Sequence, residues 1–203
     1  MYVGRVLSNE PIDMRRFDTL AVAKLARRHL ASIAEPRRRQ VLENFIEHAE
    51  AEASGQYERL MATCSKKRQS YTQYGAPGGE HLPQSYAELE KHYYNLIAAN
   101  IYLIHFEAEK LAVDDDVVFI EGLVHQLYPG RLVEPIFGIA VDDPEAVYQL
   151  TKRTALSFVF DEDGLGAGEH AFSAGPVAPA DLTEVDPALV PRAFYENPLR
   201  PRT

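Results

Sequence analysis

Residues 101–130 read IYLIHFEAEKLAVDDDVVFIEGLVHQLYPG. The stretch is rich in Ile, Val, Leu, Phe and Tyr, which favour strands, and Asp114, Asp115 and Asp116 form a turn signal at its centre. It therefore predicts two long antiparallel strands joined by a tight turn. With Asp115 at the centre of the turn, the expected opposed pairs are Leu111 with Phe119, Glu109 with Glu121, Glu107 with Leu123 and His105 with His125.

One face of this hairpin is predicted to carry a dense set of titratable groups, because side chains alternate across a strand. Its members are His105, Glu107, Glu109, Glu121 and His125. Leu103, Leu111, Phe119 and Leu123 are expected on the same face. We therefore seek a functional site there, in apolar surroundings that would perturb the pKa of an ionisable group.

Length, composition and net charge limit the class of protein. A length of 203 residues suits one domain with extensions, or at most two small ones, and 46% hydrophobic residues are enough for a sizeable core. The net charge of -9 argues against a general nucleic-acid binder. The single cysteine, Cys64, excludes an internal disulfide and a multi-cysteine zinc site.

Targeting signals are not expected. Residues 1–11 lack the apolar segment of a signal peptide, and the longest apolar stretch, residues 96–106, is too short to span a bilayer. Together with the lone cysteine, this predicts a cytoplasmic protein without membrane attachment.

The remaining elements follow from periodicity and breakers. Helices are predicted over residues 18–33, 36–53, 57–61 and 86–100, and strands over 68–74, 148–160 and 165–173. Residues 1–17 are expected to form an irregular arm, and Pro135 and Pro144 to bound a loop. The chain from Gly175 is rich in proline and is expected to be an extended tail lying on the body or on a second subunit.

Basic residues crowd the N-terminal part, including Arg37, Arg38 and Arg39 at the start of a predicted helix. Positive charges there oppose the helix dipole. Two interpretations stay open: a solvated face, or a docking surface for an acidic patch on a second subunit.

Four segments carry a resemblance to a known family. They are FIEHAEAEASGQYERLMA (45–62), GGEHLPQSYAELEKHYYNL (78–96), VDDDVVFIEG (113–122) and FVFDEDGLGAGEHAF (158–172). Their order resembles the nuclear transport factor 2-like superfamily in its SnoaL-like branch, over residues 36–174. The resemblance implies an α+β cone: a curved antiparallel sheet packed on helices around an apolar pocket, often dimeric through the sheet. Residues 1–35 would then be an N-terminal arm and helix, and residues 175–203 a C-terminal tail.

The superfamily includes ketosteroid isomerases, scytalone dehydratase, polyketide cyclases, limonene epoxide hydrolase and members without catalysis. Aligned through Gly55 and the hairpins, the isomerase tyrosine and two acids correspond to His48, Thr72 and Leu156. That trio is therefore absent, and steroid isomerisation by its mechanism is not expected. The same alignment directs Glu121, Leu123, His125 and Glu169 toward the pocket, with Tyr93 nearby.

The sequence thus predicts a cofactor-free isomerase, dehydratase or cyclase that acts by proton transfer on a small, mostly apolar carbonyl compound. His125 would be the base, Glu121 its orienting partner, and Tyr93 or His48 a donor to the developing enolate. Ligand contacts are expected from His105, Glu169, Tyr57, Tyr71, His81, Leu123 and Phe158.

Alternatives remain for this face. The histidine and carboxylate could form a structural pair, and the chain could be a non-catalytic ligand-binding or dimerisation module. No metal is expected, because no metal-binding motif accompanies His105 and His125. The expected partners are a small apolar molecule and a second copy of the chain. The apolar residues on both faces of the hairpin favour this homodimer.

Overall fold

Helix α2 (Pro36–Ala53) is the longest helix, and it begins with a proline at its first position, where the missing N–H costs no hydrogen bond. A computed structural model describes residues 2–3, 8–74 and 82–199. The other helices are α1 (Ala21–Leu30), α3 (Tyr57–Ala62), α4 (Tyr86–Ala98), α5 (Gly130–Phe137) and α6 (Arg192–Tyr195). The strands are β1 (Tyr2–Val3), β2 (Ser70–Tyr74), β3 (Ile104–Val113), β4 (Val117–Pro129), β5 (Val147–Phe160), β6 (Gly166–Ser173) and β7 (Leu182–Glu184).

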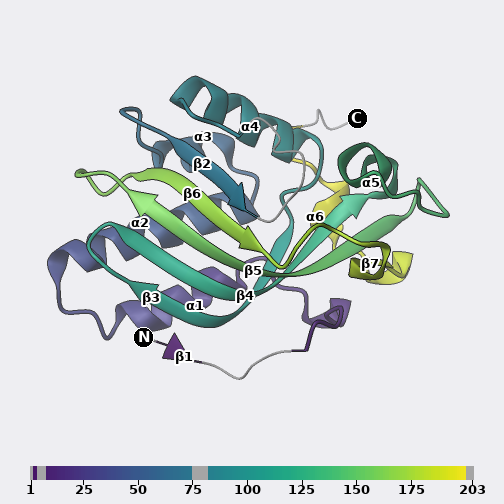
Figure 1. Ribbon diagram of the computed structural model, residues 1–203, viewed down its shortest axis with the longest axis horizontal. Coiled ribbons are helices and arrows are strands. Elements are labelled where there is room, and N and C mark those ends of the chain that lie inside the picture. The colour runs from purple at the N-terminus through teal and green to yellow at the C-terminus, as the bar shows by residue number, and fades with distance from the viewer. Residues whose placement is uncertain (1, 4–7, 75–81, 200–203) are drawn as a thin grey trace.

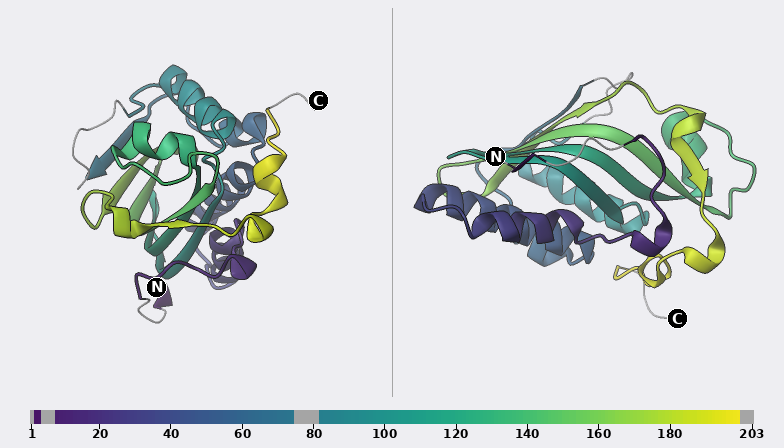
Figure 2. Two further views of the ribbon diagram at one scale, coloured as in Figure 1. Left: turned by 90° about the vertical axis from the view of Figure 1, so that its right-hand side faces the viewer. Right: turned by 90° about the horizontal axis from the view of Figure 1, so that it is seen from below.

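The strands form one sheet in the order β1-β3-β4-β5-β6-β2, with β7 pairing to β5. Pairing is antiparallel except between β2 and β6, which run parallel. The sheet arches over α1 and α2, and α4 lies near β2 (Figures 1 and 2). The predicted α+β class, with a curved sheet packed on helices, is confirmed.

The central hairpin forms as predicted, but its register changes part-way along. His105 faces His125 and Glu107 faces Leu123, as expected. A bulge then lies between Ala108 and Lys110, so that Lys110 faces Glu121. The expected pairing of Glu109 with Glu121 is therefore wrong, as is that of Leu111 with Phe119, because Leu111 faces Ile120.

Gly122 lies opposite the bulge and permits it. A Cβ atom on Gly122 would lie only 2.2 Å from the carbonyl oxygen of Glu107. The extra residue, Glu109, is 3% exposed, and Nη2 of Arg153 lies 2.8 Å from its Oε1. A bulge inserts one unpaired residue and re-aims the neighbouring side chains. Pattern alone therefore could not give the register beyond Ala108.

The concave face of the sheet packs on α1 and α2. Its apolar cluster includes Leu42 and Phe45 from α2 and, from the strands, Phe106, Leu111, Val118, Ile120 and Phe158. On β4 these are the even-numbered residues, so the odd-numbered Glu121 and His125 lie on the opposite face. The helix-facing side is thus defined by Val118 and Ile120, which are 0% and 2% exposed.

The N-terminal segment covers part of that opposite face. The backbone N–H of Asp18 donates to Nδ1 of His105 over 2.9 Å, and the Phe17 ring lies 5.9 Å from the His105 ring. Ile12 is 7% exposed, and the Gln149 amide, with its oxygen and nitrogen exchanged by a half-turn, accepts from the Ile12 N–H over 2.9 Å and donates to the Ile12 carbonyl over 3.2 Å. The arm is therefore fastened to the sheet.

Residues 182–199 also lie on the body of the chain. β7 pairs with β5, Phe194 is buried, and the Asn197 side chain donates to Oδ1 of Asn100 over 2.8 Å. The tail is thus less extended than predicted. The segment after the hairpin differs too, because residues 130–137 form a helix that contains Pro135.

The three arginines of the first turn of α2 are engaged within the chain. Arg38 pairs with Asp114 and Asp115, while Arg37 donates to the backbone carbonyls of Asp115, Asp161 and Glu162. Arg39 donates to the backbone carbonyls of Leu30 and Ile33 over 3.0 Å. They fasten the turns of two hairpins and the end of α1, while 41% of the Arg38 side chain and 40% of the Arg39 side chain stay exposed.

Among the helices that the structure describes, none combines the length and the apolar character needed to cross a bilayer.

Candidate functional site

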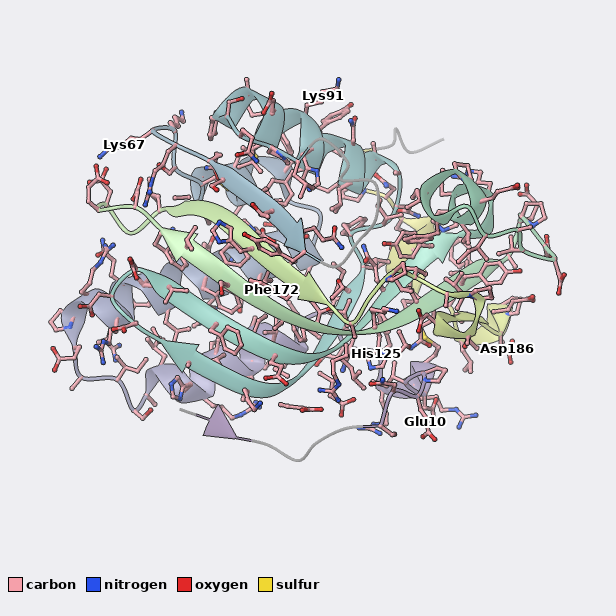
Figure 3. All side chains as sticks on the ribbon, viewed as in Figure 1. Glu10, Lys67, Lys91, His125, Phe172 and Asp186 are labelled. Atoms are coloured by element: carbon pink, nitrogen blue, oxygen red, sulfur yellow. The ribbon has the colours of Figure 1, made fainter. Side chains whose placement is uncertain are left out.

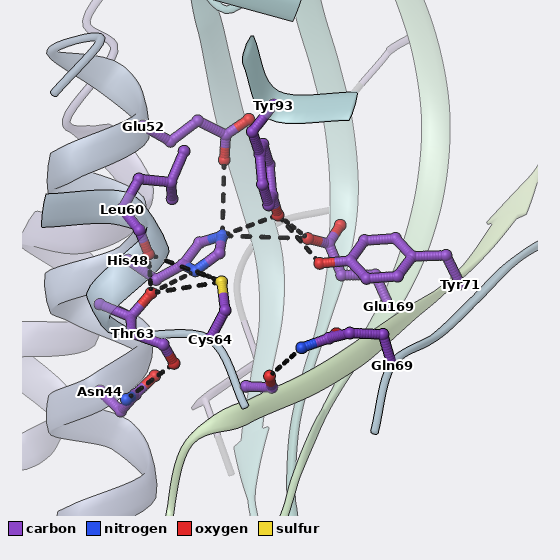
Figure 4. Close-up of polar contacts among 11 residues, drawn as sticks. Asn44, His48, Glu52, Leu60, Thr63, Cys64, Gln69, Tyr71, Tyr93 and Glu169 are labelled. Atoms are coloured by element: carbon purple, nitrogen blue, oxygen red, sulfur yellow. Dashed lines mark hydrogen bonds and ion pairs between the residues drawn. The ribbon is translucent and has the colours of Figure 1, made fainter. Parts of the chain in front are cut away.

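A buried polar cluster lies between the helices and the concave face of the sheet (Figure 4). It brings together His48, Glu52, Thr63, Cys64, Tyr71, Tyr93 and Glu169. These residues come from α2, the end of α3, β2, α4 and β6. Polar groups are rarely buried together without hydrogen-bond partners, so the cluster is the first place to seek a function.

Local structure explains why the residues converge. His48 and Glu52 are one helical turn apart on α2, and Tyr93 shares the buried side of α4 with Leu89 and Ile97. Parallel pairing of β2 with β6 puts Tyr71 opposite Glu169. That pairing requires Gly168, which has φ +149° and whose Cβ would lie 1.9 Å from the carbonyl oxygen of Ser70.

Tyr93 is the centre of the hydrogen-bond network. Its hydroxyl oxygen lies 2.8 Å from Oε1 of Glu169, 3.0 Å from Nε2 of His48 and 3.0 Å from the hydroxyl of Tyr71. On the other side of the imidazole, Nδ1 of His48 lies 2.8 Å from Oγ1 of Thr63. His48 and Tyr93 are 1% and 2% exposed, so these bonds are shielded from water.

Two carboxyl groups flank the same imidazole nitrogen. Nε2 of His48 lies 4.0 Å from Oε2 of Glu52 and 3.9 Å from Oε1 of Glu169, and each glutamate side chain is 22% exposed. Burial raises the pKa of Glu52, and the charge of Glu169 raises it further. Burial also raises the pKa of Glu169, against the hydrogen bonds from Tyr93 and Tyr71, which lower it.

The histidine is neutral in this setting, because burial lowers the pKa of His48 to about 3. Burial also raises the pKa of the Cys64 thiol to about 12, so this cysteine stays protonated. Phe158 packs edge-on to His48, with ring centroids 4.8 Å apart. The cluster therefore holds one or two exchangeable protons on carboxyl groups near neutral pH, beside two phenol hydroxyls and an apolar wall.

The predicted base, His125, lies elsewhere (Figure 3). Its Nδ1 lies 3.0 Å from Oγ1 of Thr151, and Nζ of Lys110 lies 2.7 Å from Oε2 of Glu121. Glu169 pairs opposite Phe158, which pairs opposite Val118, so Glu169 is on the helix-facing side. The expectation that Glu121, His125 and Glu169 point into one cavity is wrong, because the first two project from the other face.

The other predicted residues divide in the same way. Tyr71, Tyr93, His48, Glu169 and Phe158 belong to or touch the cluster. His105 and Leu123 lie on the face of His125, which shares their parity. Tyr57 donates from its hydroxyl to the backbone carbonyl of Glu90 on α4, and His81 lies outside the described residues.

Three members of the cluster were not predicted. Glu52 carried a signal, since it follows His48 by four residues and so had to share its helix face. No sequence signal pointed to Thr63 and Cys64, because they follow the short helix α3 and the direction of their side chains depends on tertiary packing.

A separate hollow of about 660 Å³ lies on the surface. Its lining includes Tyr57, Met61, Cys64, Lys66, Tyr86 and Asp161. Cys64 is the one residue of the cluster among these lining residues, and it is 3% exposed. The hollow therefore meets the cluster at Cys64.

Within the described part of the chain, no three His, Cys, Asp or Glu side chains are grouped so as to hold a metal ion. His125 and Glu107 come no closer than 3.9 Å, and His125 is already bonded to Thr151.

Comparisons with known proteins bear on the fold. No family model and no curated protein sequence matches the chain. A protein from Shewanella putrefaciens CN-32 described as a SnoaL-like polyketide cyclase has a similar structure, with a TM-score of 0.54 and 11% identity, covering 75% of this chain and 87% of that chain. A second such protein, from Shewanella denitrificans OS-217, has a TM-score of 0.49 and 13% identity, covering 68% and 91%.

An NTF2-like protein from Anabaena variabilis ATCC 29413 has a TM-score of 0.48 and 11% identity, covering 70% of this chain and 93% of that chain. At such identities a similarity concerns the backbone arrangement and not the reaction. The chain thus has the nuclear transport factor 2-like fold, in the form found among SnoaL-like proteins.

Proposed function

We propose that the chain is a cofactor-independent enzyme of the isomerase, dehydratase or cyclase kind, acting by proton transfer on a small, mostly apolar carbonyl compound. The observation that carries the proposal is the convergence of Glu52 and Glu169 on Nε2 of His48, at 4.0 and 3.9 Å. Two carboxyl groups with raised pKa values in one site are a recurrent arrangement for acid–base chemistry near neutral pH.

The roles divide by protonation state. The ionised carboxylate of the pair would abstract the proton next to the substrate carbonyl, and its raised pKa makes it a stronger base than a solvated glutamate. The protonated partner and the hydroxyls of Tyr71 and Tyr93 would donate to the developing enolate oxygen. Phe158 would contact the apolar part of the substrate, and His48 would hold Tyr93 in place.

The proposal replaces His125 as base with the carboxyl pair. The neighbour from Shewanella putrefaciens is described as a polyketide cyclase, which supports a reaction of this class by analogy of fold only.

The test uses NMR to measure the exchange of α-hydrogens for deuterium in a panel of enolisable ketones. We expect exchange with the unsubstituted chain and a loss of at least about 10²-fold in Glu169→Gln, because one carboxyl group can no longer carry a proton. Glu121→Gln is the matched control on the other face of the sheet, and it should keep full activity. His125→Gln tests the base expected from sequence and should also stay active.

No exchange with the unsubstituted chain, or equal rates in Glu169→Gln, would overturn the proposal. A second function, a non-catalytic ligand-binding or dimerisation module, is favoured by one observation: His48 and Tyr93 are 1% and 2% exposed, so little of the cluster is open to a substrate. A chain inactive throughout the panel that still binds an apolar ketone would support that second function.

A further inference from the structure

The position of the imidazole proton of His48 follows from the hydrogen bonds of Thr63. The hydroxyl of Thr63 donates to the backbone carbonyl of Leu60 over 2.6 Å. A hydroxyl has only one proton to donate, so toward Nδ1 of His48, at 2.8 Å, it acts as acceptor. The Cys64 thiol is a weak competitor for the same carbonyl, with its sulfur 3.5 Å from the Leu60 oxygen.

We propose that Thr63 is a positioning residue that fixes His48 as the Nδ1–H tautomer, so that Nε2 presents a lone pair to Tyr93, Glu52 and Glu169. The proposal rests on the proposed function for its catalytic meaning. The tautomer keeps the exchangeable proton of the cluster on a carboxyl group, where the reaction needs an acid, and keeps a competing N–H away from both carboxylates.

With this tautomer, one arrangement of the protons makes both hydrogen bonds of Tyr93 to Glu169 and His48. With the proton on Glu169, this carboxyl donates to the Tyr93 hydroxyl, which donates to Nε2 of His48. With the proton on Glu52, the Tyr93 hydroxyl would donate to the ionised Glu169 instead, and Nε2 of His48 would lose its donor, because Oε2 of Glu52 lies 4.0 Å away. The Nδ1–H tautomer therefore favours the arrangement with the proton on Glu169, in which His48 stays neutral.

The opposite tautomer would change the electrostatics of the pair. An Nε2–H group between two carboxyl groups would favour their ionised forms and would hold the Tyr93 hydroxyl as acceptor. The other titratable groups near the pair are Tyr71 from β2, Tyr93 and His92 from α4, and Cys64 after α3. Within the described residues, His48 supplies the ion-pair contacts of Glu52 and Glu169, so its tautomer has a large effect on them.

The first test uses the unsubstituted chain without any substrate. Nitrogen-15 NMR of uniformly labelled protein at neutral pH distinguishes a protonated ring nitrogen from an unprotonated one, and a His48→Gln sample assigns the His48 signals. We expect a protonated Nδ1 and an unprotonated Nε2. A protonated Nε2 would overturn the proposal, whatever the enzyme does.

The second test compares Thr63→Val, which removes the acceptor at nearly constant volume, with Thr63→Ser, which keeps it. In the valine variant we expect the Nε2–H tautomer to appear and the carboxyl carbons of Glu52 and Glu169 to titrate about one pH unit lower. The serine variant should restore both signatures. An unchanged tautomer in Thr63→Val, or no recovery in Thr63→Ser, would overturn the proposal.

These measurements separate the two claims. If Glu169→Gln leaves ketone exchange unchanged but His48 carries its proton on Nδ1, the proposed function fails and the tautomer stands. If exchange depends on Glu169 while His48 carries its proton on Nε2, the function stands and the role of Thr63 fails. If the valine variant does not fold, the spectrum of the unsubstituted chain still decides the tautomer.

Discussion

The hydroxyl oxygen of Tyr93 on α4 lies 2.8 Å from Oε1 of Glu169 on β6. This contact joins the helical layer to the sheet at the same carboxyl group whose pKa burial raises. Because the hydroxyl also reaches Nε2 of His48 at 3.0 Å, the protonation of Glu169 is linked to the hydrogen bonding of a residue on α2. One hydroxyl group on α4 therefore contacts side chains of both α2 and β6.

The stability of the chain should fall in acid partly through His48. Its pKa in the folded chain is lowered by burial to about 3 from an ordinary value of 6.5, so the unfolded state binds more protons between these values. The stabilisation is complete above pH 6.5 and is lost as the pH falls toward 3. Between pH 7 and pH 4, the free energy of unfolding should fall by about 3 kcal/mol less in His48→Gln than in the unsubstituted chain.

Urea unfolding at a series of pH values measures this difference. His125, whose pKa burial lowers to about 4, contributes a loss of the same sign, but it is present in both proteins and cancels in the comparison. Parallel pH profiles for the two proteins would contradict the buried neutral state of His48.

Glu52→Gln should act in the opposite pH range. Burial and the charge of Glu169 raise the pKa of Glu52 above its ordinary 4.5, so stability present below that value is lost as the pH rises through the folded-state pKa. Replacing the carboxyl by an amide removes this loss, and the variant should be about 1–3 kcal/mol more stable than the unsubstituted chain at pH 8 or above.

Glu47→Gln on the same helix is the matched control. Its pKa is lowered, first by the hydrogen bond from Arg59, so its replacement should destabilise the chain above pH 4.5. Denaturant midpoints at pH 5 and pH 8 distinguish the two variants. If both substitutions changed the stability in the same direction at pH 8, the charge of Glu52 would not be destabilising the folded chain.

Gly168→Ala should disrupt the pairing of β2 with β6. The added Cβ would lie 1.9 Å from the carbonyl oxygen of Ser70 and 2.7 Å from its carbon, so the backbone has to move. We expect a loss of about 3 kcal/mol or more in unfolding free energy. Gly138→Ala is the control, since it also has a positive φ, +69°, but meets no atom within 4 Å and should cost about 1–2 kcal/mol. Equal losses in the two variants would show that β2 and β6 are not in close contact.

The chain should form a homodimer through the convex face of the sheet. Phe172 lies there, 46% exposed (Figure 3). Tyr74, 48% exposed, stacks on it with ring centroids 4.5 Å apart. Light scattering at micromolar concentration should give a dimer mass, and Phe172→Glu should give a monomer because a charge cannot be buried in an apolar contact. Tyr195→Glu, at a residue that is 65% exposed, is the control and should stay dimeric.

The competing account is that the extensions cover the sheet within one chain. The N-terminal segment does so at the end that carries His105 and Gln149. A monomer mass for the unsubstituted chain would show that this coverage is sufficient.

The hairpin shows how far the sequence could lead. Strand propensity and the aspartate turn were sufficient to place β3 and β4 and to pair His105 with His125. They could not reveal the bulge, which depends on the close approach of Gly122 to Glu107. They also could not say which face meets the helices, because Val118 and Ile120 on one side are as apolar as Phe119 and Leu123 on the other.

Only some residues of the site could be predicted, because their contacts, like the bulge, depend on how distant parts of the chain pack. His48, Tyr93 and Glu169 entered through resemblance to a family and not through any local motif. Their contacts join residues 45 and 76 positions apart in the sequence, and no periodicity reaches across such distances. Conversely, both strand spacing and the family alignment pointed to His125 and Glu121, and the sheet turns both away from α2.

The parallel pairing of β2 with β6 also bears on how the chain folds. The contact between Ser70 and His170 spans 100 residues, and the contact between Tyr93 and Glu169 spans 76. Contacts at such separations form slowly, because the intervening loop must be closed before they contribute any stability. During synthesis, helices α1 to α5 and the hairpin of β3 and β4 would leave the ribosome before β6, so the polar cluster forms only after residue 169 has been made.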